Sequence, residues 1–196
     1  MSVKLLFFAG SSRKDSLNKK LARAACDLAM NAGATATFID LRDYPMPVYD
    51  GDWEDENGLT EAAVELKRIF TEHDGLFIAS PEHNSAYSSL LKNTLDWISR
   101  SHLENEPGLS AYQNKFAALV SASPGSLGGL RGLVSLKMLL GNIAVTVIPS
   151  QMALPQAHQA FDNDGRLKDD AKIKALSMVV GRLIDATRFG GIVKKT

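Results

Sequence analysis

The chain has 196 residues, of which 45% are hydrophobic and 22% charged, a composition typical of folded globular proteins and not of disordered or fibrous ones. It carries 22 basic and 22 acidic residues, so its net charge gives no reason to expect nucleic acid, an anionic membrane or another polyanion as a partner. We therefore expect a single domain, residues 1–196, whose partners are small molecules.

Two further features indicate the compartment. No apolar run reaches the length needed to cross a membrane, and the apolar stretch at residues 5–9 is too short for a secretion signal. The single cysteine, Cys26, excludes an internal disulfide framework and favours a reducing environment. We expect a cytoplasmic protein without a metal site, because the four histidines lack the spacing of metal ligands.

The first third of the chain alternates between strand and helix patterns. Residues 3–8 are an apolar run, interrupted only by Lys4, that ends in a glycine turn, typical of a strand buried on both faces. Over residues 17–31 apolar side chains recur at spacings of three and four, which predicts a helix. Residues 35–41 are rich in β-branched side chains and predict a second strand. Residues 44–58 carry prolines, glycines and acids without periodicity, and predict a long loop.

The same alternation continues to the end of the chain. The other predicted strands cover residues 76–79, 116–121 and 143–148, and the other predicted helices cover residues 60–70, 90–98, 130–140 and 166–189. A glycine pair follows the last helix, so residues 190–196 are predicted to form a loose tail.

Five strands alternating with five helices predict an α/β fold. Each helix must pack back on the sheet with right-handed topology, which gives a parallel sheet covered on both faces. We expect a flavodoxin-like three-layer sandwich with strand order 2-1-3-4-5, for which flavodoxin itself is the standard example. In that arrangement the loops after strands one, three and four, at residues 10–18, 80–87 and 122–129, meet at the carboxyl edge of the sheet, where ligands bind.

The first of these loops, residues 10–18, opens a helix whose unpaired N–H groups and positive dipole end favour an anion. Ser11, Ser16 and Asn18 offer short polar side chains to phosphate oxygens, and Arg13 offers a charged fork. The loop lacks the glycine spacings of triphosphate-binding and dinucleotide-binding motifs, so a single phosphate is predicted. Alternatively, Ser16 is only a helix N-cap and Arg13 a solvated surface residue.

The other two loops have the composition of a site for a planar ring. Pro81 fixes a turn whose backbone N–H groups could meet the edge of a ring, and His83 and Tyr87 could stack on its face or be ordinary loop residues. In residues 121–129 several glycines would let the backbone approach a ligand closely, although an ordinary flexible turn has the same composition.

Together these loops make the chain similar to the NADPH-dependent FMN reductases, a group that includes bacterial quinone and chromate reductases. The matching stretches are GSSRKDSLN, DLRDYPMPVYDGD, SPEHNSAYSSLLKNTLDWISR and SASPGSLGGLRG, in family order. The resemblance implies FMN as cofactor and NADPH or NADH as donor. It implies that the FMN phosphate is held by Ser11, Arg13, Ser16, Leu17 and Asn18, that the isoalloxazine is lined by Pro81, Glu82, His83, Asn84 and Ser85, and that its pyrimidine edge lies by Ser121, Ser123, Pro124 and Gly125.

The resemblance has further implications. His83 departs from the family, which usually has tyrosine there, so a stacking or hydroxyl role is in doubt and the imidazole could instead tune acceptor choice. Residues 91–97 match a segment expected to supply helix packing and subunit contacts, since the family forms homodimers or homotetramers. The resemblance implies ping-pong transfer of electron pairs from NADPH through FMN to quinones, free flavin, chromate or azo compounds, with no obligatory catalytic side chain.

Three other functions share this fold or cofactor. A flavodoxin-type electron carrier shares the fold but is usually strongly acidic, unlike this chain. A two-component receiver domain needs an acidic pair after strand one and an aspartate ending strand three, where this chain has Ala9-Gly10-Ser11 and Ser80-Pro81. An FMN-binding regulatory module without turnover has the same sequence features as the enzyme.

Overall fold

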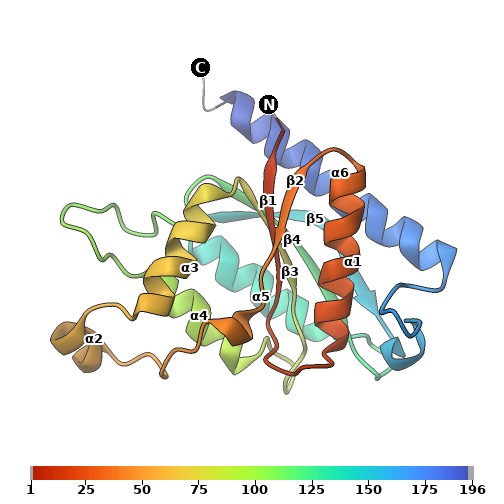
Figure 1. The fold of residues 1–196 in the computed structure, drawn as a ribbon, viewed down its shortest axis with the longest axis horizontal. Helices are drawn as coiled ribbons and strands as arrows, with labels where there is room; N and C mark the ends of the chain where they lie inside the picture. The colour runs from red at the N-terminus through yellow and green to blue at the C-terminus, as the bar shows by residue number, and fades with distance from the viewer. Residues whose placement is uncertain (1, 194–196) are drawn as a thin grey trace.

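The computed structural model describes residues 2–193, with side chains described through residue 190. Within these residues, parallel strands form a five-stranded sheet in the order β2-β1-β3-β4-β5 (Figure 1). The strands are β1 (Lys4–Ala9), β2 (Thr35–Phe38), β3 (Gly75–Ala79), β4 (Lys115–Ala122) and β5 (Val145–Leu154). The predicted flavodoxin-like strand order is confirmed.

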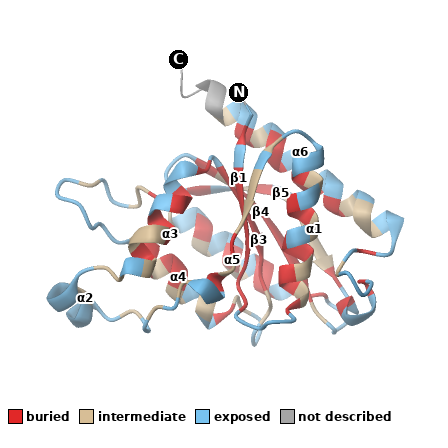
Figure 2. Ribbon diagram, viewed as in Figure 1, coloured by how far each residue is buried: buried red, intermediate tan, exposed pale blue. Residues whose placement is uncertain are grey.

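Helices cover both faces of the sheet, as the predicted three layers require (Figures 1 and 2). One face carries α1 (Leu17–Asn31) and α6 (Asp170–Val193), and the other carries α3 (Glu61–Glu72), α4 (Ser89–Ser99) and α5 (Leu130–Asn142). Of the helices within the described residues, none is both long and apolar enough to span a membrane.

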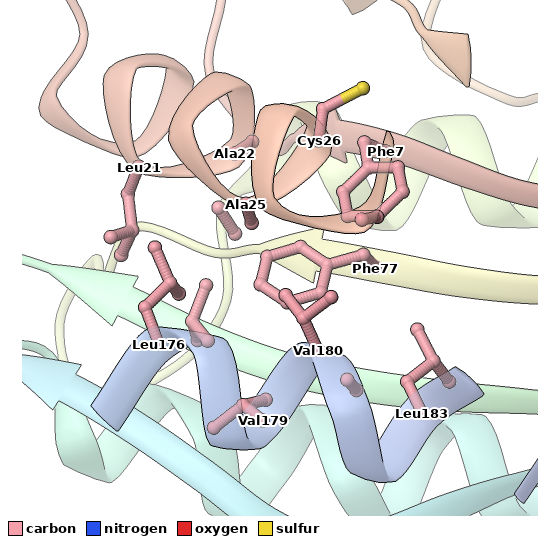
Figure 3. Packing of buried hydrophobic residues seen from close by; sticks show 14 of the residues in the cluster. Phe7, Leu21, Ala22, Ala25, Cys26, Phe77, Leu176, Val179, Val180 and Leu183 are labelled. Atoms are coloured by element: carbon pink, nitrogen blue, oxygen red, sulfur yellow. The ribbon is translucent and has the colours of Figure 1, made fainter. Parts of the chain in front are cut away.

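The core consists of two clusters because successive strand residues point to opposite faces. Leu5 and Phe7 of β1 belong to the cluster under α1 and α6, whereas Leu6 and Phe8 belong to the cluster under α3, α4 and α5. Figure 3 shows the first cluster, in which Phe7 stacks on Phe77 with ring centroids 5.0 Å apart. These four β1 side chains are fully buried, which explains why the strand is apolar from Leu5 onward.

Two strands differ from their predicted bounds. β2 ends at Phe38, and the chain turns into the short 3₁₀ helix η1 (Leu41–Asp43), capped by the Asp40 side chain, which accepts from the N–H of Arg42 at 3.0 Å. β5 runs from Val145 to Leu154, well beyond the predicted 143–148. It contains Pro149, which is tolerated because β5 is an edge strand whose register with β4 shifts nearby.

The predicted loop at residues 44–58 contains a helix, α2 (Gly51–Asn57), which lies to one side of the sheet in Figure 1. Asp50 caps its N-terminus, but none of its residues is buried, so it has no apolar periodicity to detect. Neighbouring side chains anchor it. Tyr49 donates its N–H to Asn93 Oδ1 at 2.8 Å, and the rings of Trp53 and Trp97 meet edge to face with centroids 5.5 Å apart.

The last helix also departs from its predicted bounds. α6 begins at Asp170 and continues through Val193, so residues 190–193 are helical where a loose tail was predicted, while residues 194–196 lie outside the described residues. Gly190 allows α6 to pack closely against β4 and does not end the helix. A Cβ at Gly190 would lie 2.2 Å from Phe116 Cε2, so only glycine fits against this β4 side chain.

Candidate functional site

The three predicted loops meet at the carboxyl edge of the sheet, held together by buried side chains. Ser88, the N-cap of α4, donates its hydroxyl to Gly10 O at 2.6 Å, which joins the loop after β1 to the segment after β3. Asn18 bonds both backbone groups of Ala122, its Nδ2 donating to the carbonyl and its Oδ1 accepting from the N–H, each at 2.9 Å. These bonds fix the loop after β1 to both of its neighbours.

The loop after β1 has the donors that a phosphate requires. Ser16 is the N-cap of α1, and its Oγ accepts from the N–H of Lys19 at 3.4 Å, while its own O–H can still donate. The N–H groups of Leu17 and Asn18 belong to the first turn, where a helix offers no internal acceptor. Ser11 is buried nearby, and Arg13 is exposed. The N-cap role and phosphate binding are therefore compatible at Ser16.

Asn18 also joins the loop after β1 to β4. Its side chain is buried, and the two bonds to Ala122 use the amide oxygen and one of the two amide N–H donors. One N–H of the side chain and the backbone N–H remain for a phosphate. Sequence reasoning could not find the bond to β4, because the two partners are 104 residues apart.

The loop after β3 is a tight hairpin turn. His83 and Ala86 exchange both backbone hydrogen bonds, at 2.8 and 3.0 Å, around Asn84 and Ser85. These two central residues have φ of 50° and 69°, as a type I′ turn requires. Sequence analysis predicted a turn fixed by Pro81 and missed this one, because serine seldom adopts positive φ. The His83 side chain is exposed at its corner.

Glu82 points its carboxylate at the start of α5. Its Oε1 accepts from Arg131 Nε at 2.8 Å and lies 2.5 Å from Arg131 Nη2, and its Oε2 accepts from the N–H of Gly132 at 3.2 Å. Burial alone would raise the pKa of this carboxyl, but the hydrogen bonds from Arg131 and Gly132 outweigh it and hold the pKa below its ordinary value. Glu82 is therefore an anionic cap for α5, supplied by another loop.

The loop after β4 is built on glycine. Gly128 and Gly129 have φ of 61° and 89°, and a Cβ at Gly128 would lie 2.7 Å from the backbone of Leu154. A Cβ at Gly129 would lie 1.9 Å from Ser121 Oγ. This Ser121 hydroxyl is buried at the end of β4 and has no hydrogen-bond partner among the described residues.

A cavity of about 360 Å³ opens between the last two loops. Four predicted site residues line it, Glu82, Asn84, Ser123 and Gly125, together with Ser126, Leu127, Gly128, Gly129 and Arg131, which were not predicted as site residues. None of the residues of the loop after β1 lines the cavity, and neither do the remaining predicted site residues of the other two loops. Arg131 could have been proposed from the sequence, since it is a cation directly after a glycine-rich loop.

The model of the NADPH-dependent FMN reductase family matches residues 3–159, which include all three loops. The chain belongs to this family. It is an FMN-dependent oxidoreductase that uses NAD(P)H.

Individual relatives of this chain agree with the family assignment. A 2-hydroxy-1,4-benzoquinone reductase from Burkholderia sp. is 34% identical over 65% of this chain, which spans 64% of that protein. An NADPH azoreductase from Bacillus sp. is 30% identical over 87% of this chain and 85% of its own length. The solved structure of FerB, a flavoenzyme NAD(P)H:(acceptor) oxidoreductase from Paracoccus denitrificans, superposes with a TM-score of 0.81 at 28% identity, covering 96% of this chain and 98% of FerB.

The residues of this FMN reductase fit its cofactor. The α1 N-terminus supplies backbone N–H and hydroxyl donors suited to a monophosphate. The unpartnered Ser121 hydroxyl at the end of β4 is a buried polar group without a protein partner, which is costly unless a ligand or water completes it. Cys26 offers no competing thiol chemistry, because burial, followed by the nearby Asp27 charge, raises its pKa to about 11.

Proposed function

We propose that this chain, acting as a single domain, takes electron pairs from a reduced nicotinamide nucleotide and passes them through FMN to small acceptors. The observation that carries this proposal is the meeting of the α1 N-terminus, the buried Ser121 hydroxyl and an open polar cavity at one edge of the sheet. When bound, FMN supplies the two-electron chemistry, and the protein binds and orients it.

The binding roles are divided among the three loops. We assign the phosphate to the donors of Ser11, Arg13, Ser16, Leu17 and Asn18, of which Arg13 is the exposed cation. We assign the ring to the loop after β3, at Pro81, Glu82, His83, Asn84 and Ser85, and its pyrimidine edge to the loop after β4, at Ser121, Ser123, Pro124 and Gly125. Because the turn and the glycine loop are fixed by backbone hydrogen bonds, they orient a ring before it reacts.

Glu82 enters this assignment indirectly. Its carboxylate is occupied by Arg131 and the N–H of Gly132, so its contribution is to hold the loop after β3 against α5. None of the assigned side chains has to move a proton, which leaves the site without an obligatory catalytic acid or base.

The acceptors we propose are quinones first, then azo compounds, free flavin and chromate. Quinone and azo reduction are named activities of two of the relatives above. Because the cavity is open, the donor could leave before the acceptor enters the same place, which is ping-pong turnover. Initial rates measured over a matrix of NADPH and quinone concentrations should give parallel double-reciprocal lines, and intersecting lines would contradict this order.

The experiment that tests the proposal is a spectrum of the purified protein after FMN is added and the unbound excess removed, followed by NADPH without oxygen. We expect retained flavin bands that bleach with NADPH and return on addition of a quinone. Retained bands that never bleach would instead establish a carrier or regulatory module. Loss of all flavin would contradict the phosphate assignment itself.

We propose further that the protein is a homodimer or homotetramer in which α5 forms a subunit contact. Leu130, Val134 and Met138 recur at spacings of four along α5 and are 48%, 69% and 66% exposed. Such a stripe is unfavourable in water and suits a second copy. Val134→Glu should lower the mass measured by light scattering, whereas Met178→Glu, at an exposed position on α6, should not.

The subunit contacts that the resemblance implied for residues 91–97 are limited by burial. Leu91, Leu95 and Trp97 are buried inside the chain and supply the expected helix packing. Among residues 91–97 Lys92 is the exposed one, so a second copy would contact this segment chiefly through it.

We propose the cytoplasm as the compartment. The single cysteine is buried and forms no disulfide within the chain, which suits a reducing compartment, and the proposed donor NADPH is found inside cells. Fractionation of the producing cells should recover the protein with cytosolic markers, and recovery with an exported fraction would contradict the proposal.

A further inference from the structure

Arg131 lies at the rim of the cavity, in the first turn of α5, and is held there by a residue from another loop. Its side chain is 60% exposed, whereas that of its partner Glu82 is only 9% exposed. The two loops that carry them are packed together, since a Cβ at Gly132 would lie 3.0 Å from the carbonyl oxygen of Ala86. The guanidinium is therefore fixed at its inner side and open at its outer side.

The hydrogen bonding of Arg131 leaves donors unused. A guanidinium carries five N–H donors, and Glu82 occupies the side formed by Nε and Nη2. In the part of the chain that the structure describes, Nη1 has no acceptor. A planar fork whose inner side is held by a buried carboxylate is pre-organised, so little side-chain freedom is lost when its outer side binds a ligand.

The N–H donors on the open side of Arg131 indicate which kind of ligand can bind there. Guanidinium N–H donors match phosphate oxygens, and apart from Glu82 and Arg131 themselves the cavity is lined by neutral residues, among them the polar Asn84, Ser123 and Ser126. Glu82 offsets the net charge of Arg131, so the recognition of a phosphate at the outer side rests on the directed N–H donors there.

This site is separate from the one assigned to the FMN phosphate. That phosphate belongs to the loop after β1, whereas Arg131 follows β4, and β3 lies between these strands in the sheet. None of the residues assigned to that phosphate lines the cavity beside Arg131. A second phosphate must therefore come from another molecule that enters the cavity.

We propose that Arg131 binds a phosphate group of the reduced nicotinamide nucleotide, and that Glu82 is the residue that positions it. This inference rests on the proposed function, because it names how that site recognises its donor. The phosphate is either the 2′-phosphate, which only NADPH carries, or the pyrophosphate, which NADPH and NADH share. In the first case Arg131 determines which of the two donors is preferred.

The test compares three donors on the FMN-loaded protein: NADPH, NADH and N-benzyl-dihydronicotinamide, which carries no phosphate. Arg131→Gln should raise KM for NADPH roughly tenfold or more, as expected when a charged hydrogen bond is lost, and should leave kcat nearly unchanged. A rise confined to NADPH assigns the 2′-phosphate, and an equal rise for NADH assigns the pyrophosphate. Lys137→Gln, which removes an exposed charge of the same helix away from the cavity, should change neither KM.

A double variant protects the test against misfolding, because Arg131→Gln alone leaves the buried Glu82 carboxylate without its cation. Glu82→Gln with Arg131→Gln removes both charges and retains an acceptor for Gly132, and it should show the same rise in KM. The proposal is overturned if NADPH and NADH keep their KM in both variants, or if the phosphate-free donor is impaired equally. Failure of the proposed function would look different, since wild-type protein would then fail to retain flavin or to be bleached by any donor.

Discussion

The two edges of the sheet differ in how completely their polar side chains are paired. At the amino edge, Lys67 and Glu106 form a buried ion pair at 2.7 Å, and both Glu106 oxygens accept further hydrogen bonds from the segment that precedes β4. His73 lies close by, and both of its ring nitrogens have partners, Ile69 O and Thr37 Oγ1. At the carboxyl edge, by contrast, the Ser121 hydroxyl and the outer side of Arg131 have no partner among the described residues.

This difference distinguishes a charged pair that only stabilises the fold from a charged pair that can also bind a ligand. Glu106–Lys67 and Glu82–Arg131 have the same components, a buried carboxylate, a cation and backbone N–H donors. Lys67 is enclosed by its partners, whereas the Arg131 side chain is mostly exposed. A pair that is closed on all sides can only stabilise the fold, while a pair with an open side can also bind a ligand.

The largest effect we predict is at the closed edge. Glu106→Gln leaves the buried Lys67 without its counterion, and breaking a buried pair in this way should cost about 3 kcal/mol of unfolding free energy. FMN affinity should not change, because the pair lies at the edge opposite the loops. Denaturant midpoints and FMN titrations would measure both. Glu65→Gln, at an exposed pair with Arg68, is the matched control and should cost less than about 1 kcal/mol.

The same pair predicts an acid dependence of stability. Burial raises the pKa of the Glu106 carboxyl, but hydrogen bonds from Lys67, Ser110 and two backbone N–H groups outweigh it and lower the pKa from 4.5 to about 2. A depressed folded pKa contributes stability above pH 4.5 that is lost as the pH falls towards 2. Wild type should therefore lose more stability than Glu106→Gln over this window, and parallel curves would contradict the assignment.

At the open edge, removal of a cation should affect binding and leave stability unchanged. Arg13 is exposed in the loop after β1, so Arg13→Ala should unfold at the wild-type denaturant concentration. FMN affinity should fall by roughly 1.5 to 3 kcal/mol, the range for hydrogen bonds to charged groups, which is about 10- to 150-fold. Lys14→Ala, the next residue and also exposed, is the control for a general loss of charge. An unchanged FMN titration would show that Arg13 is only a solvated surface residue.

The sequence could predict what depends on local pattern. β1 from Leu5 onward and β3 are continuous apolar runs because both of their faces are buried, and the strand order then placed the three loops at one edge. The sequence could not predict the bonds of Asn18 to Ala122 or of Glu82 to Arg131, whose partners lie 104 and 49 residues away. Such contacts arise only after the sheet has formed, and no local propensity encodes them.

Other features were not predicted because their residue types usually indicate a different local structure. The acidic α2 has no buried face, so the periodicity that identifies helices is absent from it. The glycine at 190 resembles a helix end but serves the close contact with Phe116. Ser85 adopts a positive φ that sequence patterns assign to glycine or asparagine.

An intermediate effect is predicted for Asn18, whose buried hydrogen bonds support the fold and also fix the proposed phosphate loop at the carboxyl edge. Asn18→Ala removes both buried bonds to Ala122 and should cost about 2 kcal/mol of unfolding free energy. Because the loop after β1 is then no longer fixed to β4, FMN should also bind more weakly and dissociate faster in stopped-flow experiments. Asn31→Ala, at the exposed end of the same helix, is the control. If stability falls while FMN dissociation is unchanged, Asn18 supports only the fold.

The smallest effect is predicted for His83, which is exposed at the corner of the turn and lines neither the core nor the cavity. The turn is held by the backbone of His83 and Ala86, so His83→Tyr should change neither stability nor FMN affinity by more than a few tenths of a kcal/mol. What should change is the ratio of kcat/KM among quinones, ferricyanide and azo dyes, because the exposed side chain at this corner is free to contact an acceptor. An acceptor profile identical to wild type would show that at His83 only the backbone matters.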